Sequence, residues 1–164
     1  MAVSSPVLRK NVTPMPEVSV PIHILAHGQG LTLPAYATAG SAGCDLRAAI
    51  EAELTITPGG RTMVPTGIAV AIPEGFEGQV RIRSGLAHDA GLAILNAPGT
   101  IDSDYRGEIR VILANLGPDP VTFHRGDRIA QLIIAPVARA RFEPVAELPP
   151  SSRGAGGFGS TGKK

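Results

Sequence analysis

Short stretches in which apolar and polar residues alternate run along most of the chain. The stretch ELTIT, residues 53–57, has the period of two that is expected of a strand with one buried face. In QVRIRS, residues 79–84, the same alternation places the two apolar side chains on one face and Arg81 and Arg83 on the other. Both stretches therefore predict β-strands whose two faces lie in different surroundings.

Four further stretches have the β-branched, apolar composition of strands: residues 18–25, 66–73, 108–115 and 128–137. The last of them, RIAQLIIAPV, is apolar on both faces apart from Arg128 and Gln131, so we expect it to be buried on both sides. Gly- and Pro-containing turns separate the strands at 58–60, 73–78 and 117–120. Turn signals that recur about every 8–12 residues favour an all-β sandwich or barrel, and only residues 85–90 could form a short helix.

Composition agrees with one all-β domain that has different segments at its ends. Of the 164 residues, 43% are hydrophobic but only 4% are aromatic, so Val, Ile, Leu and Ala must build the core. The 20 glycines and 15 prolines favour turns over long helices. We expect a disordered arm at 1–17, the β core at 18–147 and a flexible, glycine-rich lid at 148–164.

Charge and cysteine content exclude several classes of partner. The formal net charge is only +1, whereas proteins that coat nucleic acids need clustered Lys and Arg. The lone Cys44 has no second cysteine with which to form a disulfide in the chain, which agrees with a reducing compartment. The N-terminal sequence MAVSSPVLRKN lacks the apolar part of a secretory signal, and no apolar run approaches the ~18 residues of a membrane span. We therefore expect a cytoplasmic protein without nucleic-acid or membrane partners.

The C-terminal sequence SSRGAGGFGSTGKK, residues 151–164, invites comparison with a phosphate-binding loop. Residues 157–163 match G-x-x-x-x-G-K, but Lys164 stands where Ser or Thr should follow, and the strand and helix that flank such a loop are missing. A solvated linker is the ordinary interpretation of such a tail. Phe158 argues against it, because a ring between two glycines suits stacking on a flat partner, and Arg153 suits a phosphate oxygen.

Four other stretches contain candidate functional residues, and each has an ordinary structural interpretation. Aspartates such as Asp45, Asp102 and Asp104 are common in turns and caps. Arg83 alone could be a surface residue of a strand, and Tyr105 could lie at the edge of the core. Gln131 requires more explanation, because an amide in an otherwise apolar strand must find hydrogen-bond partners, although these can be purely structural. None of the residues is specific by itself.

Taken together and in order, five stretches resemble the five motifs of the homotrimeric dUTPase family. They read AGSAGCDLRA, RSGLA, GTIDSDYRGE, RGDRIAQLI and RGAGGFGSTG, and the resemblance extends from Val18 to Gly162. The third and fifth are the most specific. The resemblance implies a jelly-roll-like, β-clip subunit and a homotrimer with shared active sites. It also implies hydrolysis of dUTP to dUMP and pyrophosphate with Mg²⁺, which keeps uracil out of DNA and supplies dUMP for dTMP synthesis.

By this resemblance, the segment from Asn96 to Tyr105 is the nucleoside pocket. Main-chain groups would bind uracil and the sugar, and the ring of Tyr105 would pack under the deoxyribose and exclude a 2′-hydroxyl. Asp102 matches the general base, which would direct a water molecule at the α-phosphorus. The pocket residues implied are Asn96, Gly99, Thr100, Ile101, Asp102 and Tyr105.

The resemblance also assigns the phosphate side of the site and the lid. Phosphate contacts are implied for Arg83, Ser84, Gly85 and Gln131. Asp45 would order the metal and phosphate region through water, with no direct protein ligand to Mg²⁺, because this ion keeps several waters and prefers phosphate oxygens. In the lid, Arg153 would bind the terminal phosphate and Phe158 would stack on uracil, followed by Gly159, Ser160 and Thr161.

Two other functions remain open at this point. A dCTP deaminase on a related fold would need a carboxylate beside C4 of the base, and neither RSGLA nor the 96–108 segment has an evident glutamate for it. A nucleotide sensor would bind dUTP without hydrolysing it, but such a protein would not require Asp102. Ammonia release from dCTP would identify the first alternative, and the absence of pyrophosphate release from dUTP would identify the second.

Overall fold

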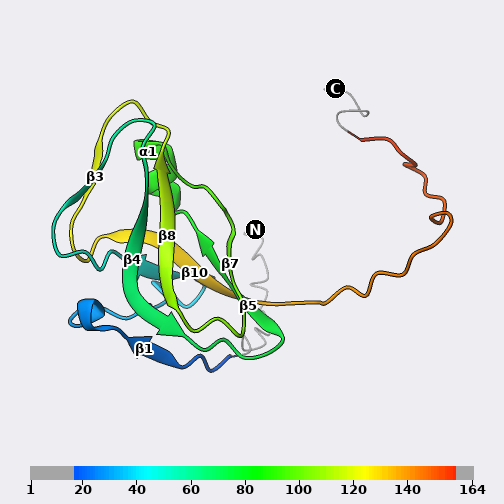
Figure 1. The fold of residues 1–164 in the computed structure, drawn as a ribbon, viewed down its shortest axis with the longest axis horizontal. Coiled ribbons are helices and arrows are strands. Elements are labelled where there is room, and N and C mark those ends of the chain that lie inside the picture. Colours follow the sequence, from blue (N-terminus) through cyan, green and yellow to red (C-terminus); the bar gives the residue numbers. More distant parts are fainter. Residues whose placement is uncertain (1–16, 158–164) are drawn as a thin grey trace, which may run out of the picture.

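A computed structural model describes residues 17–157 of the chain, and it consists mainly of β-strands (Figure 1). Its strands are β1 (Ile22–Ile24), β2 (Cys44–Arg47), β3 (Leu54–Ile56), β4 (Arg61–Val70), β5 (Phe76–Arg81), β6 (Leu92–Ile94), β7 (Gly99–Ile101), β8 (Glu108–Asn115), β9 (Val121–Phe123) and β10 (Arg128–Pro136). Its helices are a 3₁₀ turn, η1 (Ala26–Gly28), and one short α-helix, α1 (Ser84–Ala90). Within the described part of the chain, neither helix is long and apolar enough to cross a membrane. The expected all-β, jelly-roll-like fold is confirmed.

Two four-stranded sheets enclose one hydrophobic core. The first sheet has the order β1-β4-β8-β6 and the second has the order β2-β10-β5-β7, while β3 and β9 form a separate two-stranded ribbon. Val64 and Val111 from the first sheet and Leu46 and Ile129 from the second are fully buried in the same cluster. As the composition predicted, the core is mainly aliphatic, with Phe123 as its fully buried aromatic residue among those described.

The predicted strands correspond to β1, β3, β4, β5, β8 and β10, but their limits differ. β4 begins at Arg61 rather than at residue 66, because its first half alternates around the buried Val64 and pairs with β8. The expectation that residues 128–137 are buried on both sides is wrong for the single chain. Gln131 and Ile133 are only half-buried, since no layer of the described chain covers their face of the sheet.

The short helix expected at 85–90 is confirmed as α1, which begins one residue earlier. It ends where Gly91 adopts a left-handed conformation, with φ 65°, and donates its N–H to the carbonyl of Leu86. A residue with a Cβ is disfavoured in this conformation, so the glycine sets the point at which the helix stops. The helix therefore follows directly from the end of β5 and fixes the position of residues 84 and 85.

Beyond β10 the described chain has no regular structure and leads away from the sheets (Figure 1, orange to red). Residues 136–155 are all exposed, including two large apolar side chains, Phe142 at 91% and Leu148 at 84% of their full accessible surface. Extended backbone with exposed apolar side chains gains little by lying free in water. This segment therefore has the character of an arm that reaches another surface.

Candidate active site

A row of polar side chains crosses the second sheet on the face opposite the core. Gln131 in β10 pairs with Asp45 in β2 on one side and with Arg81 in β5 on the other. Directly paired residues on neighbouring strands project to the same face of a sheet, so these three side chains lie in line. Three residues that the sequence places far apart thus meet on one surface.

Asp45 connects this row to two arginines. Its Oδ1 lies 3.2 Å from Nε of Arg83, and its Oδ2 lies 3.2 Å from Nη1 of Arg128. The Asp45 side chain is 17% exposed, against 27% for Arg83 and 48% for Arg128. We call the four residues Asp45, Arg83, Arg128 and Gln131 the phosphate cluster. The exposed Ser84 and Gly85 follow Arg83 directly at the start of α1, so they lie beside the cluster.

The segment predicted to hold the nucleoside begins at Asn96 and contains β7. Gly99 to Ile101 pair with Val80 to Gly78 of β5. A Cβ on Gly99 would lie 3.2 Å from Nδ2 of Asn96 and 3.4 Å from the Cβ of Val80. Glycine at this position therefore lets the Asn96 amide lie directly against the main chain of β7, which favours recognition by backbone groups.

Asp102 and Tyr105 lie together in the turn that joins β7 to β8. The main-chain N–H of Tyr105 donates to the carbonyl of Asp102 at 3.1 Å, and the Tyr105 hydroxyl donates to the carbonyl of Glu108 at 3.0 Å. Both residues line an open cleft of about 560 Å³, together with Thr100, Ile101, Arg110 and Ile112. A cleft of this volume is suited to a small organic ligand. We call residues 96–108 the nucleoside hairpin after the turn-rich hairpin that the sequence suggested, but its strands do not pair with each other: β7 pairs with β5, and β8 pairs with β4 and β6.

Glu108 anchors the end of this hairpin, a role that the sequence did not indicate. Its Oε1 accepts hydrogen bonds from Nε2 of His27 at 2.6 Å and from the N–H of Gly67 at 2.8 Å, and its Oε2 accepts from Nε of Arg110 at 3.0 Å. Burial by itself would raise the pKa of this carboxyl, but the bonds from His27, Gly67 and Arg110 outweigh it, so the pKa lies below its ordinary value. Glu108 is therefore held as a carboxylate.

Within one chain, Arg83 of the phosphate cluster and Asp102 lie beyond opposite ends of the pairing between β5 and β7. Ile101 pairs with Gly78, so Asp102 extends past Gly78 in one direction while Arg83 lies five residues past it in the other. At a rise of about 3.3 Å per strand residue, six residues correspond to about 20 Å. The two parts cannot contact the same phosphate within a single chain.

The predicted lid residues lie apart from both regions. Arg153 is exposed in a bend of the C-terminal segment, where its Nε donates to the carbonyl of Gly156 at 2.6 Å. Arg153 belongs to the end of the segment that leaves β10, which is drawn red in Figure 1 and leads away from the sheets. The remaining predicted lid residues, Phe158, Gly159, Ser160 and Thr161, lie outside the described residues.

The acidic groups near the phosphate cluster fit a metal that is held mainly by its ligand. Among residues 17–157, no three side chains of His, Cys, Asp or Glu gather in a way that could hold a metal ion. Asp45 already contacts an arginine with each of its oxygens. Mg²⁺ bound to phosphate oxygens and water needs few protein ligands, so this donor set suits a metal that arrives with a nucleotide.

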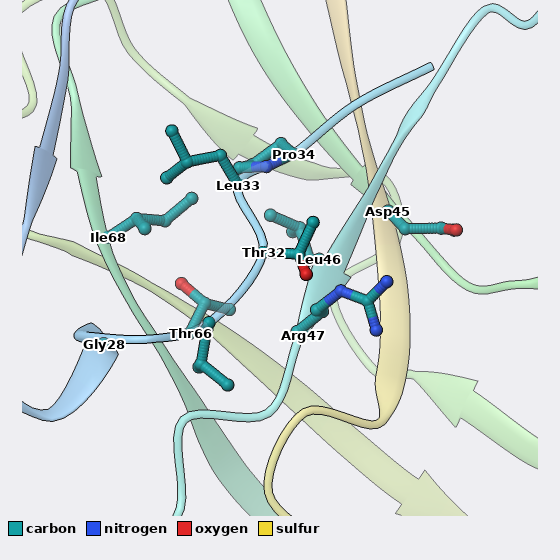
Figure 2. A pocket seen from close by; sticks show the side chains of 10 residues that line it. Gly28, Thr32, Leu33, Pro34, Asp45, Leu46, Arg47, Thr66 and Ile68 are labelled. Carbon is teal, nitrogen blue, oxygen red and sulfur yellow. The ribbon is translucent and has the colours of Figure 1, made fainter. Parts of the chain in front are cut away.

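A second hollow behind β2 does not extend the site. It is lined by residues such as Gly28, Thr32, Thr66 and Ile68, and its volume of about 10 Å³ is that of about one water molecule. Figure 2 shows the carboxylate of Asp45 pointing away from Thr66 and Ile68, out of this hollow. The hollow therefore belongs to the packing of η1 and the following loop, and Asp45 faces the phosphate cluster.

The chain is similar to known proteins over most of its length. The family model described as dUTPase matches residues 29–162. The deoxyuridine 5'-triphosphate nucleotidohydrolase of Rhizobium etli is 59% identical over 140 residues, which are 84% of this chain and 90% of that protein. The enzyme of the same name from Anaplasma marginale is 56% identical over 145 residues, 88% of this chain and 99% of its own.

Two solved structures have a similar fold. The dUTPase of Staphylococcus bacteriophage 80alpha, in a variant with bound dUpNHpp, superposes with a TM-score of 0.78 at 25% identity, over 88% of this chain and 98% of that chain. A variant of the dUTPase from phage phi11 of S. aureus, described with a structural Mg(II) ion, superposes with a TM-score of 0.70 at 22% identity, over 79% and 97% of the two chains. At this identity the second structure supports the fold alone.

Proposed function

Because this chain belongs to the dUTPase family, we propose that it hydrolyses dUTP to dUMP and pyrophosphate. The observation that carries the proposal is the cleft whose wall contains both Asp102 and Tyr105. Its volume suits a nucleoside, and it is adjacent to a strand whose main chain can read a base. In the cytoplasm, this reaction would keep uracil out of DNA and supply dUMP for dTMP synthesis.

The nucleoside hairpin would select the base and the sugar. A short strand such as β7 presents a fixed pattern of main-chain hydrogen-bond donors and acceptors. The Asn96 amide, which packs against Gly99, adds a polar side chain beside this strand. A site built to satisfy particular hydrogen bonds rejects analogues that leave them unpaired, by up to ~10⁴-fold or more. The Tyr105 ring, whose hydroxyl is bonded to Glu108, would pack against the deoxyribose and leave no space for a 2′-hydroxyl.

Asp102 would act as the general base. It is exposed at the wall of the cleft, where its carboxyl oxygens can accept a hydrogen bond from a water molecule and orient it. The water would attack the α-phosphorus as Asp102 takes up its proton, and pyrophosphate would leave. General bases of this kind contribute typically 10²–10⁴-fold to a rate.

The phosphate side of the site would consist of Arg83, Ser84, Gly85 and Gln131. Guanidinium donors and amide groups make charge-assisted hydrogen bonds with phosphate oxygens, and the exposed start of α1 leaves room for such a ligand beside Arg83. Mg²⁺ bound to the triphosphate would neutralise part of its charge. Asp45 would act on this region through water and through its arginine partners and would not bind the metal directly.

A homotrimer with shared sites would bring these parts together. The separation of about 20 Å between Asp102 and Arg83, which follows from a strand rise of about 3.3 Å, supports an assembly in which a second copy supplies one of them. The exposed segment after β10 could deliver Arg153, Phe158 and residues 159–161 from a neighbouring copy as a lid. Closing a lid excludes water from the reaction and adds contacts to the triphosphate.

The test compares the wild-type protein with Asp102→Asn in a pyrophosphate-release assay with Mg²⁺ and dUTP, dTTP, dCTP or UTP. Asp104→Asn is the matched control, because Asp104 is an exposed carboxylate in the same turn. We expect turnover of dUTP alone, a loss of 10²-fold or more in Asp102→Asn with binding of dUpNHpp retained, and little change in the control. Full activity of Asp102→Asn would remove this residue from the role of base. Wild-type protein that binds dUTP without releasing pyrophosphate would instead be a sensor, and ammonia release from dCTP would indicate a deaminase.

A further inference from the structure

Arg128 reaches the phosphate cluster because β10 contains a bulge. Arg128 pairs with Arg47, but Ala130 pairs with Leu46 and Gln131 with Asp45, so one extra residue is accommodated between 128 and 130. In a regular strand, residues 128 and 131 would project to opposite faces. The bulge turns both Ile129 and Ala130 into the core, where they are fully buried, and leaves Arg128 on the same face as Gln131.

The contact of Arg128 with Asp45 balances the charge of that aspartate. Asp45 alone beside a triphosphate site would repel the ligand, but its two oxygens face two guanidinium groups, and the three side chains together have a net positive charge. The shared carboxylate also limits the movement of Arg83, because it accepts a hydrogen bond from Nε of Arg83. The side chain of Arg128 is 48% exposed, and ion pairs with such exposure contribute little to folding stability. The arrangement therefore calls for an explanation other than stability.

We propose that Arg128 is a positioning residue of the phosphate site. It holds Oδ2 of Asp45, so that Oδ1 of the same carboxylate fixes the guanidinium of Arg83 in the orientation that meets a phosphate group. Its second effect is to neutralise Asp45 before the ligand arrives. This proposal rests on the proposed function, because the anion that Arg83 would meet is the triphosphate of dUTP. Binding of an inorganic polyphosphate tests the role of Arg128 without any reaction.

The experiment measures KM and kcat for dUTP in Arg128→Ala, Arg128→Lys, Asp45→Asn and the double variant of Arg128→Ala with Asp45→Asn. Arg61→Ala is the control, because Arg61 is an exposed arginine at the start of a strand in the other sheet. The dissociation constant of each full-length protein for inorganic tripolyphosphate, in the presence of Mg²⁺, is measured by calorimetry. Melting temperatures at equal protomer concentration report on folding.

We expect Arg128→Ala to raise KM for dUTP and the dissociation constant for tripolyphosphate by about tenfold or more, with a smaller change in kcat. Arg128→Lys keeps the positive charge and one donor nitrogen, so it should recover part of the lost affinity. Arg61→Ala should keep the KM and the tripolyphosphate affinity of the wild type. Because Arg128 acts through Asp45, its removal should have little further effect once Asp45 is Asn.

Two results would overturn the proposal. One is an Arg128→Ala protein whose KM and tripolyphosphate affinity stay within twofold of wild type. The other is a pair of losses from Arg128→Ala and Asp45→Asn that simply multiply in the double variant, which would mean that Arg128 acts independently of Asp45. A wild-type protein that binds tripolyphosphate in the way described but releases no pyrophosphate from dUTP would contradict the proposed function and leave the positioning role of Arg128 intact.

Discussion

The phosphate cluster and the nucleoside hairpin offer different chemical groups for the recognition that we propose. In the cluster, charged side chains from β2, from β10 and from the residue before α1 are held by their contacts with each other, and Asp45 is the point at which they meet. In the hairpin, main-chain groups are presented by a strand of three residues, and the side chains that matter there, such as Asn96 and Tyr105, are bonded or packed against the backbone. Recognition would therefore depend mainly on charge in the cluster and mainly on the shape of the main chain in the hairpin.

This difference separates affinity from selectivity. Every nucleoside triphosphate has the same phosphate groups, so changes in the cluster should alter the binding of all of them by similar factors. Changes in the hairpin should alter the ratio between one base or sugar and another, because the hairpin, unlike the cluster, would contact the parts in which they differ. The two regions should therefore respond differently to substitution. Deletion of the proposed lid, which belongs to neither region, should show how much the lid adds to both.

The largest effect is expected from deletion of residues 151–164, which leaves both regions intact. The deletion removes Arg153 and Phe158. In the proposed lid, a charge-assisted contact to a terminal phosphate would contribute about 1.5–3 kcal/mol and stacking on a base would contribute ~1–3 kcal/mol. We expect kcat/KM for dUTP to fall by about 10²-fold or more. The assembly state, measured by sedimentation, should be unchanged. Normal hydrolysis by the truncated protein would show that the cluster and the hairpin suffice without a lid.

A smaller effect that is specific to the hairpin is expected from Tyr105→Phe. The change removes the hydrogen bond from the Tyr105 hydroxyl to the carbonyl of Glu108 and keeps the ring, so about 1 kcal/mol of positioning is lost. We expect the preference for dUTP over UTP to fall by roughly fivefold, measured as the ratio of the two kcat/KM values. The control is Tyr36→Phe, since Tyr36 is exposed and outside both regions.

The comparison with the cluster decides how this result is interpreted. If Tyr105→Phe lowered kcat/KM for dUTP and UTP equally, the hairpin would be contributing affinity in the way that the cluster does. If Arg128→Ala in turn changed the ratio between dUTP and UTP, the cluster would be contributing selectivity. Either outcome would contradict the division between the two regions.

The sequence predicted the all-β fold from its alternating pattern, and the motifs proposed both regions of the site. It could not predict that Arg128 belongs to the cluster, because strict alternation places residues 128 and 131 on opposite faces, and the bulge depends on how β10 pairs with β2. It also missed short strands such as β7 and β9.

The role of Glu108 was hidden from the sequence for a related reason. Its partners His27 and Gly67 are 81 and 41 residues away, and only the folded chain brings η1 and β4 to the end of the hairpin. The separation between Asp102 and Arg83 was equally invisible, because it depends on the antiparallel register of β5 and β7. Long-range pairing therefore explains most of what the local pattern left out.

The last substitution, Glu108→Gln, is expected to change folding stability. It tests whether Glu108 anchors the end of the hairpin. The pKa of Glu108 lies below its ordinary value in the folded chain, so its contribution to stability is present above pH 4.5 and is lost as the pH falls through the folded-state pKa. Replacing the carboxylate weakens hydrogen bonds from His27 and Arg110, which should cost about 1–2 kcal/mol at pH 7. Urea unfolding at equal protomer concentration should show this difference at pH 7 and a smaller one below pH 4, whereas Glu147→Gln, on the exposed C-terminal segment, should show neither. A difference that stayed constant with pH would mean that the amide fits poorly at position 108 and that the charge of Glu108 does not anchor the hairpin.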